Sequence, residues 1–176
     1  MGFHYRDNKV NLSNANLNGP CPGRMRPHYL NHGPGEYGSV AYDWGGFDTV
    51  EQYNTFMAQG SQAGDIPIDR NDPPTPCSKG VDCSGFVSRC WRLPNKEGTS
   101  TLHRVSVRIE RSQLQPGDIL LLAGAHVTLY HHTDAEGIWA FECTTWGERD
   151  RVIFRPHPNT YYVGYEARRF NNICPG

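Results

Sequence analysis

The chain has 176 residues, which suits one domain with a sizeable core, and its 37% hydrophobic content is typical of a globular protein. A formal net charge of −1 supplies no basic field for nucleic acid or an anionic membrane. No apolar run reaches the roughly 18 residues of a membrane-spanning helix. Nucleic-acid binding and membrane insertion are therefore not expected.

The first half of the chain predicts one helix between two irregular segments. Residues 1–40 predict a loop, because Asn, Gly and Pro recur and no apolar period holds. Residues 47–59 predict a helix with Asp48 as N-cap and Gly60 at its end. Residues 61–80 predict a long polar connection.

The second half predicts a helix followed by strands. Residues 83–92 carry apolar side chains on one helical face, and Pro94 stops the helix. A turn is expected at 114–117. The predicted strands are 105–109, 118–122, 125–130, 138–145, 151–154 and 161–165. Helices followed by antiparallel strands predict an α+β domain with its N-terminal helices packed on a central antiparallel sheet.

Cys83 is the candidate nucleophile. It lies at the expected start of a helix, where free N–H groups and the helix dipole stabilise a thiolate, the nucleophilic form of cysteine. Ser84 and Gly85 are small, which gives a substrate carbonyl room to approach, and the Cys83 N–H is placed to donate to an oxyanion. The alternative is a buried cysteine that only packs.

His126 is the candidate base, because a cysteine nucleophile needs an imidazole near its sulfur. It begins the predicted strand 125–130, with Thr128 and Tyr130 on the same face. The alternative is a structural histidine beside a core.

Glu142 is the candidate third member of the set, because a carboxylate in a mostly apolar strand needs a partner. If strand 138–145 pairs with the preceding strand, Glu142 can reach the far nitrogen of His126 and orient the ring. The alternative is a structural ion pair with an arginine such as Arg149 or Arg168.

The other cysteines leave the cellular compartment open. A free Cys83 leaves five cysteines, so at most two disulfides form within the chain. Cys21 and Cys174 lie near the two ends, where a clasp would be useful, and Cys90 fits a small buried position. Residues 1–18 lack the apolar core of a signal peptide, so either the protein is intracellular or a targeting segment lies outside this chain. No cysteine spacing fits a common zinc site, so no metal is expected.

Four motifs in order resemble one family. They are Tyr42–Gly46 (YDWGG), Asp82–Val87 (DCSGFV), Leu114–Ile119 (LQPGDI) and Ala125–Tyr130 (AHVTLY). Together they resemble the NlpC/P60 cysteine peptidases, which have a reduced papain-like fold and cleave bacterial cell-wall peptides. The resemblance covers about residues 40–145.

The resemblance implies a catalytic domain over 39–176, preceded by an extension or strap over 1–38. It implies that Cys83 and His126 are the nucleophile and base. The third position, often histidine in the family, falls on Glu142. A Pro-rich loop over 66–81 is longer than in many members and is expected to wall the cleft.

The resemblance also implies substrate-binding residues. Tyr42 is similar to a tyrosine that lines the site and helps to bind the scissile carbonyl. Asp82 and Ser84 are similar to residues that receive the free amino end of a stem peptide. A carboxylate suits an ammonium group, but an aspartate before a helix also serves as an N-cap, and both interpretations stay open for Asp82.

The implied function is hydrolysis of peptidoglycan stem peptides, between D-Glu and a diamino acid, through a thioester and without a cofactor. The implied setting is a secreted, periplasmic or cell-envelope monomer, with an inhibitor or immunity protein as a candidate partner. The alternatives are an amidase or acyltransferase using the same Cys–His pair, and an inactive cell-wall-binding module. The order of Cys83 before His126 favours the peptidase branch.

Overall fold

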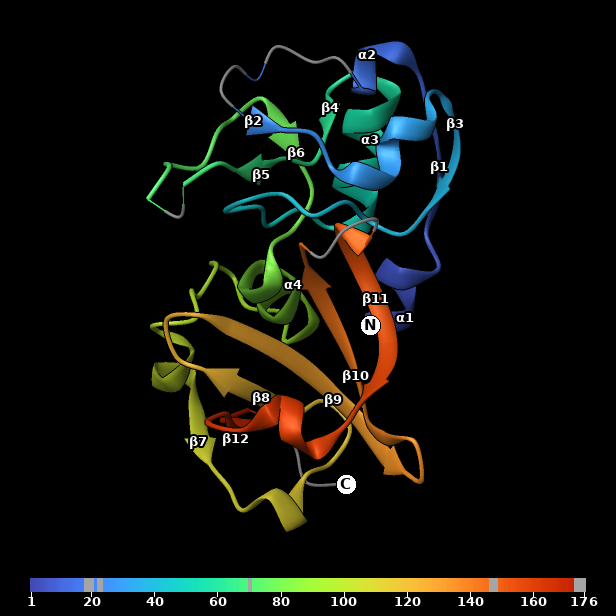
Figure 1. The fold of residues 1–176 in the computed structure, drawn as a ribbon. Helices are drawn as coiled ribbons and strands as arrows, with labels where there is room; N and C mark the ends of the chain where they lie inside the picture. Colours follow the sequence, from blue (N-terminus) through green and yellow to red (C-terminus); the bar gives the residue numbers. More distant parts are fainter. Residues whose placement is uncertain (18–20, 22–23, 70, 146–148, 173–176) are drawn as a thin grey trace.

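A sheet of six antiparallel strands lies in the lower half of the molecule in Figure 1. The computed structural model describes residues 1–17, 21, 24–69, 71–145 and 149–172. The strand order is β11-β10-β9-β8-β12-β7, and helix α4 (Cys83–Cys90) packs against β9 and β10. A lobe of short elements around helix α3 (Val50–Ala58) lies above the sheet (Figure 1). The predicted α+β class is confirmed.

The large sheet contains five of the six strands that the sequence predicts, and its sixth strand, β12, replaces the predicted strand at 161–165. Its strands are β7 (Ser106–Arg108), β8 (Ile119–Leu122), β9 (His126–Asp134), β10 (Gly137–Thr144), β11 (Arg151–His157) and β12 (Glu166–Phe170). β9 and β10 form the expected hairpin, in which Leu129 lies opposite Phe141. The expected turn before β8 is present at Pro116 and Gly117.

The predicted strand at 161–165 is wrong. A 3-10 helix, η5 (Asn159–Tyr162), follows Pro158 there. Residues 163 and 164 then form a turn, with Gly164 at φ +85°, so the segment is not extended.

The strand that the sequence does not predict is β12, which inserts between β8 and β7. Its sequence is mostly charged and only Ala167 is buried in the core, so it lacks the apolar alternation that predicts a strand. Its arginines are paired instead of solvated: Arg168 contacts Glu166 at 2.7 Å, and Arg169 contacts Asp118 at 2.7 Å.

Helix α3 lies where it was predicted, but its N-cap is Thr49 and not Asp48. Thr49 Oγ1 accepts from the Gln52 N–H at 3.1 Å, and the Gln52 side chain accepts from the Thr49 N–H at 2.9 Å, which is a capping box. The Asp48 carboxylate accepts from the Gly80 N–H at 2.8 Å instead. Gly60 follows the helix with φ +81°, as the predicted helix end requires.

The predicted loop over residues 1–40 is also wrong. The segment contains α1 (Gly2–Arg6), β1 (Lys9–Leu12), α2 (Asn14–Leu17), β2 (Arg24–Met25), the 3-10 helix η1 (His28–His32) and β3 (Gly35–Gly38). β1 and β3 pair with each other, and α1 lies beside β11 (Figure 1). Tyr5, Leu12 and Leu30 are buried in the same core as Phe86 of α4. These elements are too short to show an apolar period, so the pattern that predicts long helices and strands does not detect them.

The predicted connection over 61–80 carries three two-residue strands. They are β4 (Gln62–Ala63), β5 (Ile66–Pro67) and β6 (Ser78–Lys79). β5 pairs with β2, and β4 pairs with β6. A disulfide joins Cys21 to Cys77, so Cys21 does not clasp Cys174, which lies outside the described residues. Disulfides persist in oxidising compartments, and this one fits an extracellular protein.

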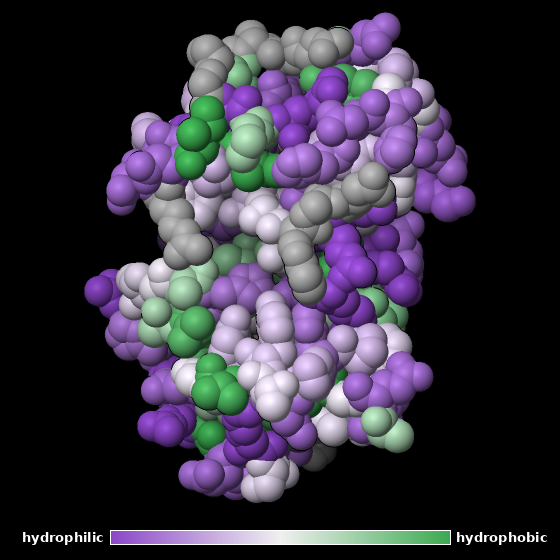
Figure 2. Space-filling view, in the orientation of Figure 1, coloured by the Kyte–Doolittle hydropathy of each residue, from purple (hydrophilic) through white to green (hydrophobic). Residues whose placement is uncertain are grey.

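Two further short helices are η2 (Leu102–Val105) and η3 (Arg111–Gln113). Within the described part of the chain, no helix combines the length and apolar character needed to cross a membrane. The face drawn in Figure 2 is mainly hydrophilic, with its hydrophobic residues in small separate groups.

Candidate active site

A cavity of about 1080 Å³ lies where the start of α4 meets the start of β9. Five of the six candidate site residues from the sequence line it: Tyr42, Asp82, Cys83, Ser84 and His126. The sixth, Glu142, is fully buried behind His126. The fold therefore brings together side chains that are up to 100 positions apart in the sequence.

Cys83 is the first residue of α4, as the sequence predicts. Asp82 is the N-cap and accepts from the Gly85 N–H at 2.7 Å. At this position Cys83 feels the positive end of the helix dipole.

Gly85 is required for a reason that the sequence does not show. A Cβ at residue 85 would lie 1.9 Å from the backbone oxygen of Gly46. The glycine therefore lets the first turn of α4 pack directly on the segment Tyr42–Gly46, which forms another wall of the cavity. The room that Gly85 supplies is used by the protein backbone.

His126 lies between Cys83 and Glu142. It is the first residue of β9, its side chain is 17% exposed, and its Nε2 lies 3.0 Å from Glu142 Oε2. Glu142 contacts Nε2, which leaves Nδ1 as the ring nitrogen available to the Cys83 side chain that lines the same cavity. The predicted contact between Glu142 and the far nitrogen of His126 is confirmed.

The surroundings of His126 favour the charged form of its ring. Burial favours the neutral ring, but the hydrogen bonds and charges of Cys83 and Glu142 outweigh burial and raise the pKa of His126 to about 9. An imidazolium beside a cysteine stabilises a thiolate, which is the reactive form in cysteine hydrolases.

Glu142 is the centre of a buried polar cluster. Its Oε2 accepts from His126 and from the Tyr161 hydroxyl at 3.3 Å. Its Oε1 contacts His157 Nε2 at 2.7 Å and accepts from Arg155 Nε at 3.2 Å. Burial opposes ionisation, but the hydrogen bonds from His126 and His157 outweigh it and hold the pKa of Glu142 well below its usual range. The carboxylate is therefore ionised when it contacts the imidazolium.

Arg155, His157 and Tyr161 are missing from the sequence-based set. For Arg155 and His157 the signal lies in the strand register: Arg155 is opposite Ala140 and His157 is opposite Ile138, on the face of β10 that carries Glu142. The predicted strand 151–154 stops before both residues. The alternative, an ion pair with an arginine, is also present, but through Arg155, since Arg168 contacts Glu166.

Tyr42 and Ser84 also lie at the cavity. Tyr42 is 7% exposed, and burial raises the pKa of its phenol well above the usual value, so the hydroxyl stays a donor. Ser84 Oγ donates to Asp82 Oδ1 at 2.9 Å. The N-cap interpretation of Asp82 is confirmed, and its role in substrate binding stays a prediction.

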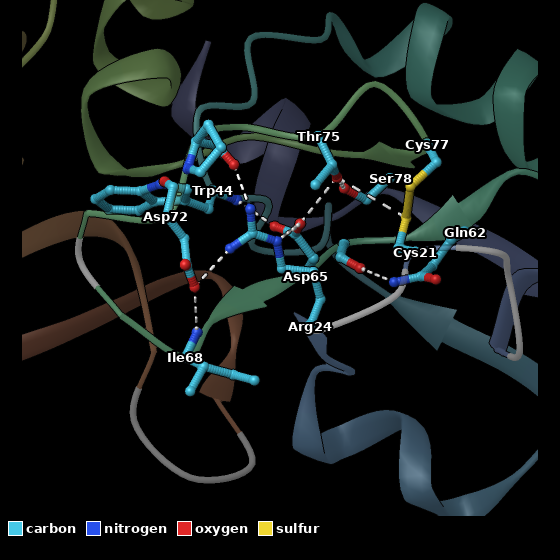
Figure 3. A network of polar contacts seen from close by, with 12 residues as sticks. Cys21, Arg24, Trp44, Gln62, Asp65, Ile68, Asp72, Thr75, Cys77 and Ser78 are labelled. Atoms are coloured by element: carbon cyan, nitrogen blue, oxygen red, sulfur yellow. Dashed lines mark hydrogen bonds and ion pairs between the residues drawn. A yellow bond between two sulfur atoms is a disulfide. The ribbon is translucent and has the colours of Figure 1, made fainter.

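The Pro-rich connection forms one wall of the cavity, and the N-terminal segment holds it in place (Figure 3). Arg24, whose side chain is 6% exposed, contacts Asp72 at 2.8 Å and Asp65 at 3.6 Å. Trp44 donates from Nε1 to the Asp72 backbone oxygen at 2.7 Å. The disulfide lies at the other end of this network, where Thr75 contacts both Asp65 and Cys21 (Figure 3).

Comparison with known proteins adds no assignment. No family model matches the chain, and a search of curated proteins finds no match. The resemblance to the NlpC/P60 peptidases therefore rests on the four motifs, and the chemistry of the site rests on its geometry.

Proposed function

We propose that this protein is a cysteine peptidase of papain-like fold that hydrolyses peptide bonds in peptidoglycan stem peptides. The observation that carries the proposal is the series Cys83–His126–Glu142: Cys83 at a helix start and His126 line one cavity, and a buried carboxylate contacts the His126 ring. Nucleophile, base and orienting group are the three parts that acyl transfer by cysteine requires.

In the proposed mechanism, the Cys83 thiolate attacks the scissile carbonyl carbon and the carbonyl electrons move to oxygen. The Cys83 backbone N–H and the Tyr42 hydroxyl donate to that oxyanion. His126 then gives its proton to the leaving amine as the C–N bond breaks, which leaves a thioester on Cys83. Water attacks the thioester while His126 accepts a proton, and the sulfur leaves as the acid product forms. Glu142 keeps Nε2 of His126 engaged throughout, so Nδ1 stays directed at the reaction.

The substrate class comes from the four motifs, and two structural features support it. The cavity of about 1080 Å³ can hold several residues of a peptide. The disulfide between Cys21 and Cys77 fits the oxidising exterior or periplasm, where peptidoglycan is found. We place the protein outside the cytoplasm, with an inhibitor or immunity protein as a candidate partner.

Digestion of defined muropeptides, with fragments weighed by mass spectrometry, tests the proposal. The wild-type protein should cut a stem peptide between D-Glu and the diamino acid, and Cys83→Ala should lose cleavage while still binding the peptide. Cys90→Ala is the matched control, because Cys90 lies in the same helix at its other end, outside the cavity lining. Cleavage by Cys83→Ala at the wild-type rate would refute the nucleophile assignment.

The same experiment separates the alternatives. An amidase or acyltransferase would consume a different amide or transfer the acyl group to an added amine, and each gives a distinct product mass. A binding module would retain the muropeptide without cutting it in either protein.

A further inference from the structure

Four donors fill the acceptor positions of the Asp82 carboxylate. Oδ1 accepts from the N–H of Gly85 at 2.7 Å and from Ser84 Oγ at 2.9 Å. Oδ2 accepts from the N–H of Gly45 at 3.0 Å and from the Lys96 ammonium. A carboxylate offers about four acceptor positions. A substrate ammonium group at Asp82 would therefore have to displace a donor of the protein itself.

Lys96 gives this end of the cavity a spare donor group. Its side chain is 22% exposed, and it lines the cavity together with Cys83 and His126. An ammonium carries three N–H donors, so its contact with Asp82 leaves two for a ligand. Among the described residues that line the cavity, Lys96 is the only lysine or arginine.

The fold fixes the position of Lys96. The next residue, Glu97, donates from its N–H to Ser88 Oγ at 3.0 Å, and Ser88 Oγ donates to the Glu97 backbone oxygen at 3.2 Å. Ser88 lies in α4 and is fully buried. The ammonium is thus presented from a segment tied to the helix that carries the candidate nucleophile.

Donor groups and not net charge are what this position offers an anion. The His126 imidazolium is balanced by Glu142, and the Lys96 ammonium is paired with Asp82. The remaining N–H groups of Lys96 and the positive end of the α4 dipole still point toward a ligand in the cavity. The other acidic lining residue, Asp72, is already paired with Arg24.

Resting on the peptidase function proposed above, we infer that Lys96 is a specificity-determining residue that binds a substrate carboxylate beside the scissile bond. The cleft then selects peptides with an acidic residue before the scissile bond, and the protein donates hydrogen bonds at the position next to Cys83. The sequence motif implies the opposite for Asp82 and Ser84, namely that the protein accepts hydrogen bonds from a substrate ammonium group.

The first test uses two peptides that differ only in a free carboxylate or a carboxamide on the residue before the scissile bond. Wild-type protein should prefer the carboxylate by about 10- to 100-fold in kcat/KM, mainly through a lower KM. This factor corresponds to the free energy of one hydrogen bond to a charged group. Lys96→Met keeps the aliphatic stem and should reduce the preference to about twofold or less. Lys96→Arg keeps a cation and should retain the preference, which a purely structural role would not predict.

The second test needs no peptide. Cys83 is alkylated with iodoacetate or iodoacetamide, and the Cys83 fragment is followed by mass spectrometry. The ratio of the iodoacetate rate to the iodoacetamide rate should fall about tenfold in Lys96→Met, since one reagent carries a carboxylate and the other does not.

The two tests distinguish a failure of the peptidase proposal from a failure of the inference about Lys96. If the wild type cleaves neither peptide while the alkylation ratio depends on Lys96, the peptidase proposal is overturned and the anion site stands. If Lys96→Met leaves both the peptide preference and the alkylation ratio unchanged, the inference about Lys96 is overturned and the peptidase proposal stands.

Discussion

Replacement of Glu142 by glutamine removes one charge from the buried cluster and keeps its shape. The amide cannot stabilise the His126 imidazolium as the carboxylate does, and it faces Arg155 and His157 without a compensating charge. Breaking a buried ion pair by removing one partner costs about 3–5 kcal/mol, so we expect a loss of unfolding free energy in that range.

The effect on catalysis should be larger and should carry a pH signature. An amide in place of a triad acid lowers turnover by up to about 10⁴-fold, so we expect Glu142→Gln to lose about 10²- to 10⁴-fold in kcat/KM. The pKa of His126, about 9 in the wild type, should fall because a charge that raises it is gone. The alkaline limit of activity should therefore move to lower pH by one unit or more. Peptide cleavage measured between pH 5 and 10, with urea unfolding beside it, reports both effects.

Glu136→Gln is the matched control, because Glu136 is exposed in the turn of the same hairpin. It should keep the wild-type rate, pH profile and stability. If Glu142→Gln also kept the wild-type rate and alkaline limit, Glu142 would have no role in orienting His126.

Three further predictions concern stability. A pKa of His126 raised from 6.5 to about 9 corresponds to about 3 kcal/mol of unfolding free energy. This stabilisation should be complete below pH 6.5 and lost as the pH rises through 9. Unfolding curves of wild type and His126→Gln should therefore differ most at pH 6 and converge above pH 9. The disulfide between Cys21 and Cys77 spans 56 positions and should contribute about 4 kcal/mol to the free energy of unfolding. A reductant should therefore lower the melting temperature of the wild type and leave that of the variant with both cysteines replaced by serine unchanged. An equal drop in both proteins would contradict this. Gly85→Ala should unfold at a much lower temperature than the wild type or fail to fold. Gly98→Ala is the control, because its Cβ meets nothing closer than 4.0 Å, and it should have the melting temperature of the wild type. Equal melting temperatures of the two variants would rule out the close approach of residue 85 to the Gly46 backbone.

The sequence predicts best the parts of the fold with strong periodicity. The helix that starts at Cys83 and the hairpin that joins His126 to Glu142 follow from apolar spacing and strand alternation. The strand register fixes which side chains of the hairpin share a face, so it places His126 and Glu142 together. The position of Cys83 beside them depends on the packing of α4 against β9 and β10.

The rest depends on contacts between distant segments. β12 cannot be recognised as a strand from its charged sequence, because the carboxylates that pair with its arginines, Glu166 within the strand and Asp118 outside it, are known only from the structure. His157 joins the Glu142 cluster only because β11 extends past Pro156. The disulfide joins Cys21, which precedes β2, to Cys77, which directly precedes β6, and no local pattern reveals that these segments meet.

The central claim is that the Cys83 sulfur is made reactive by the His126 imidazolium. The most direct measurement is the rate at which iodoacetamide alkylates Cys83 at pH 6 in the wild type and in His126→Ala, followed by mass spectrometry of the Cys83 fragment. We predict that the wild-type rate is at least about tenfold higher, because a neighbouring cation favours the thiolate. Equal rates in the two proteins at pH 6 would contradict the claim.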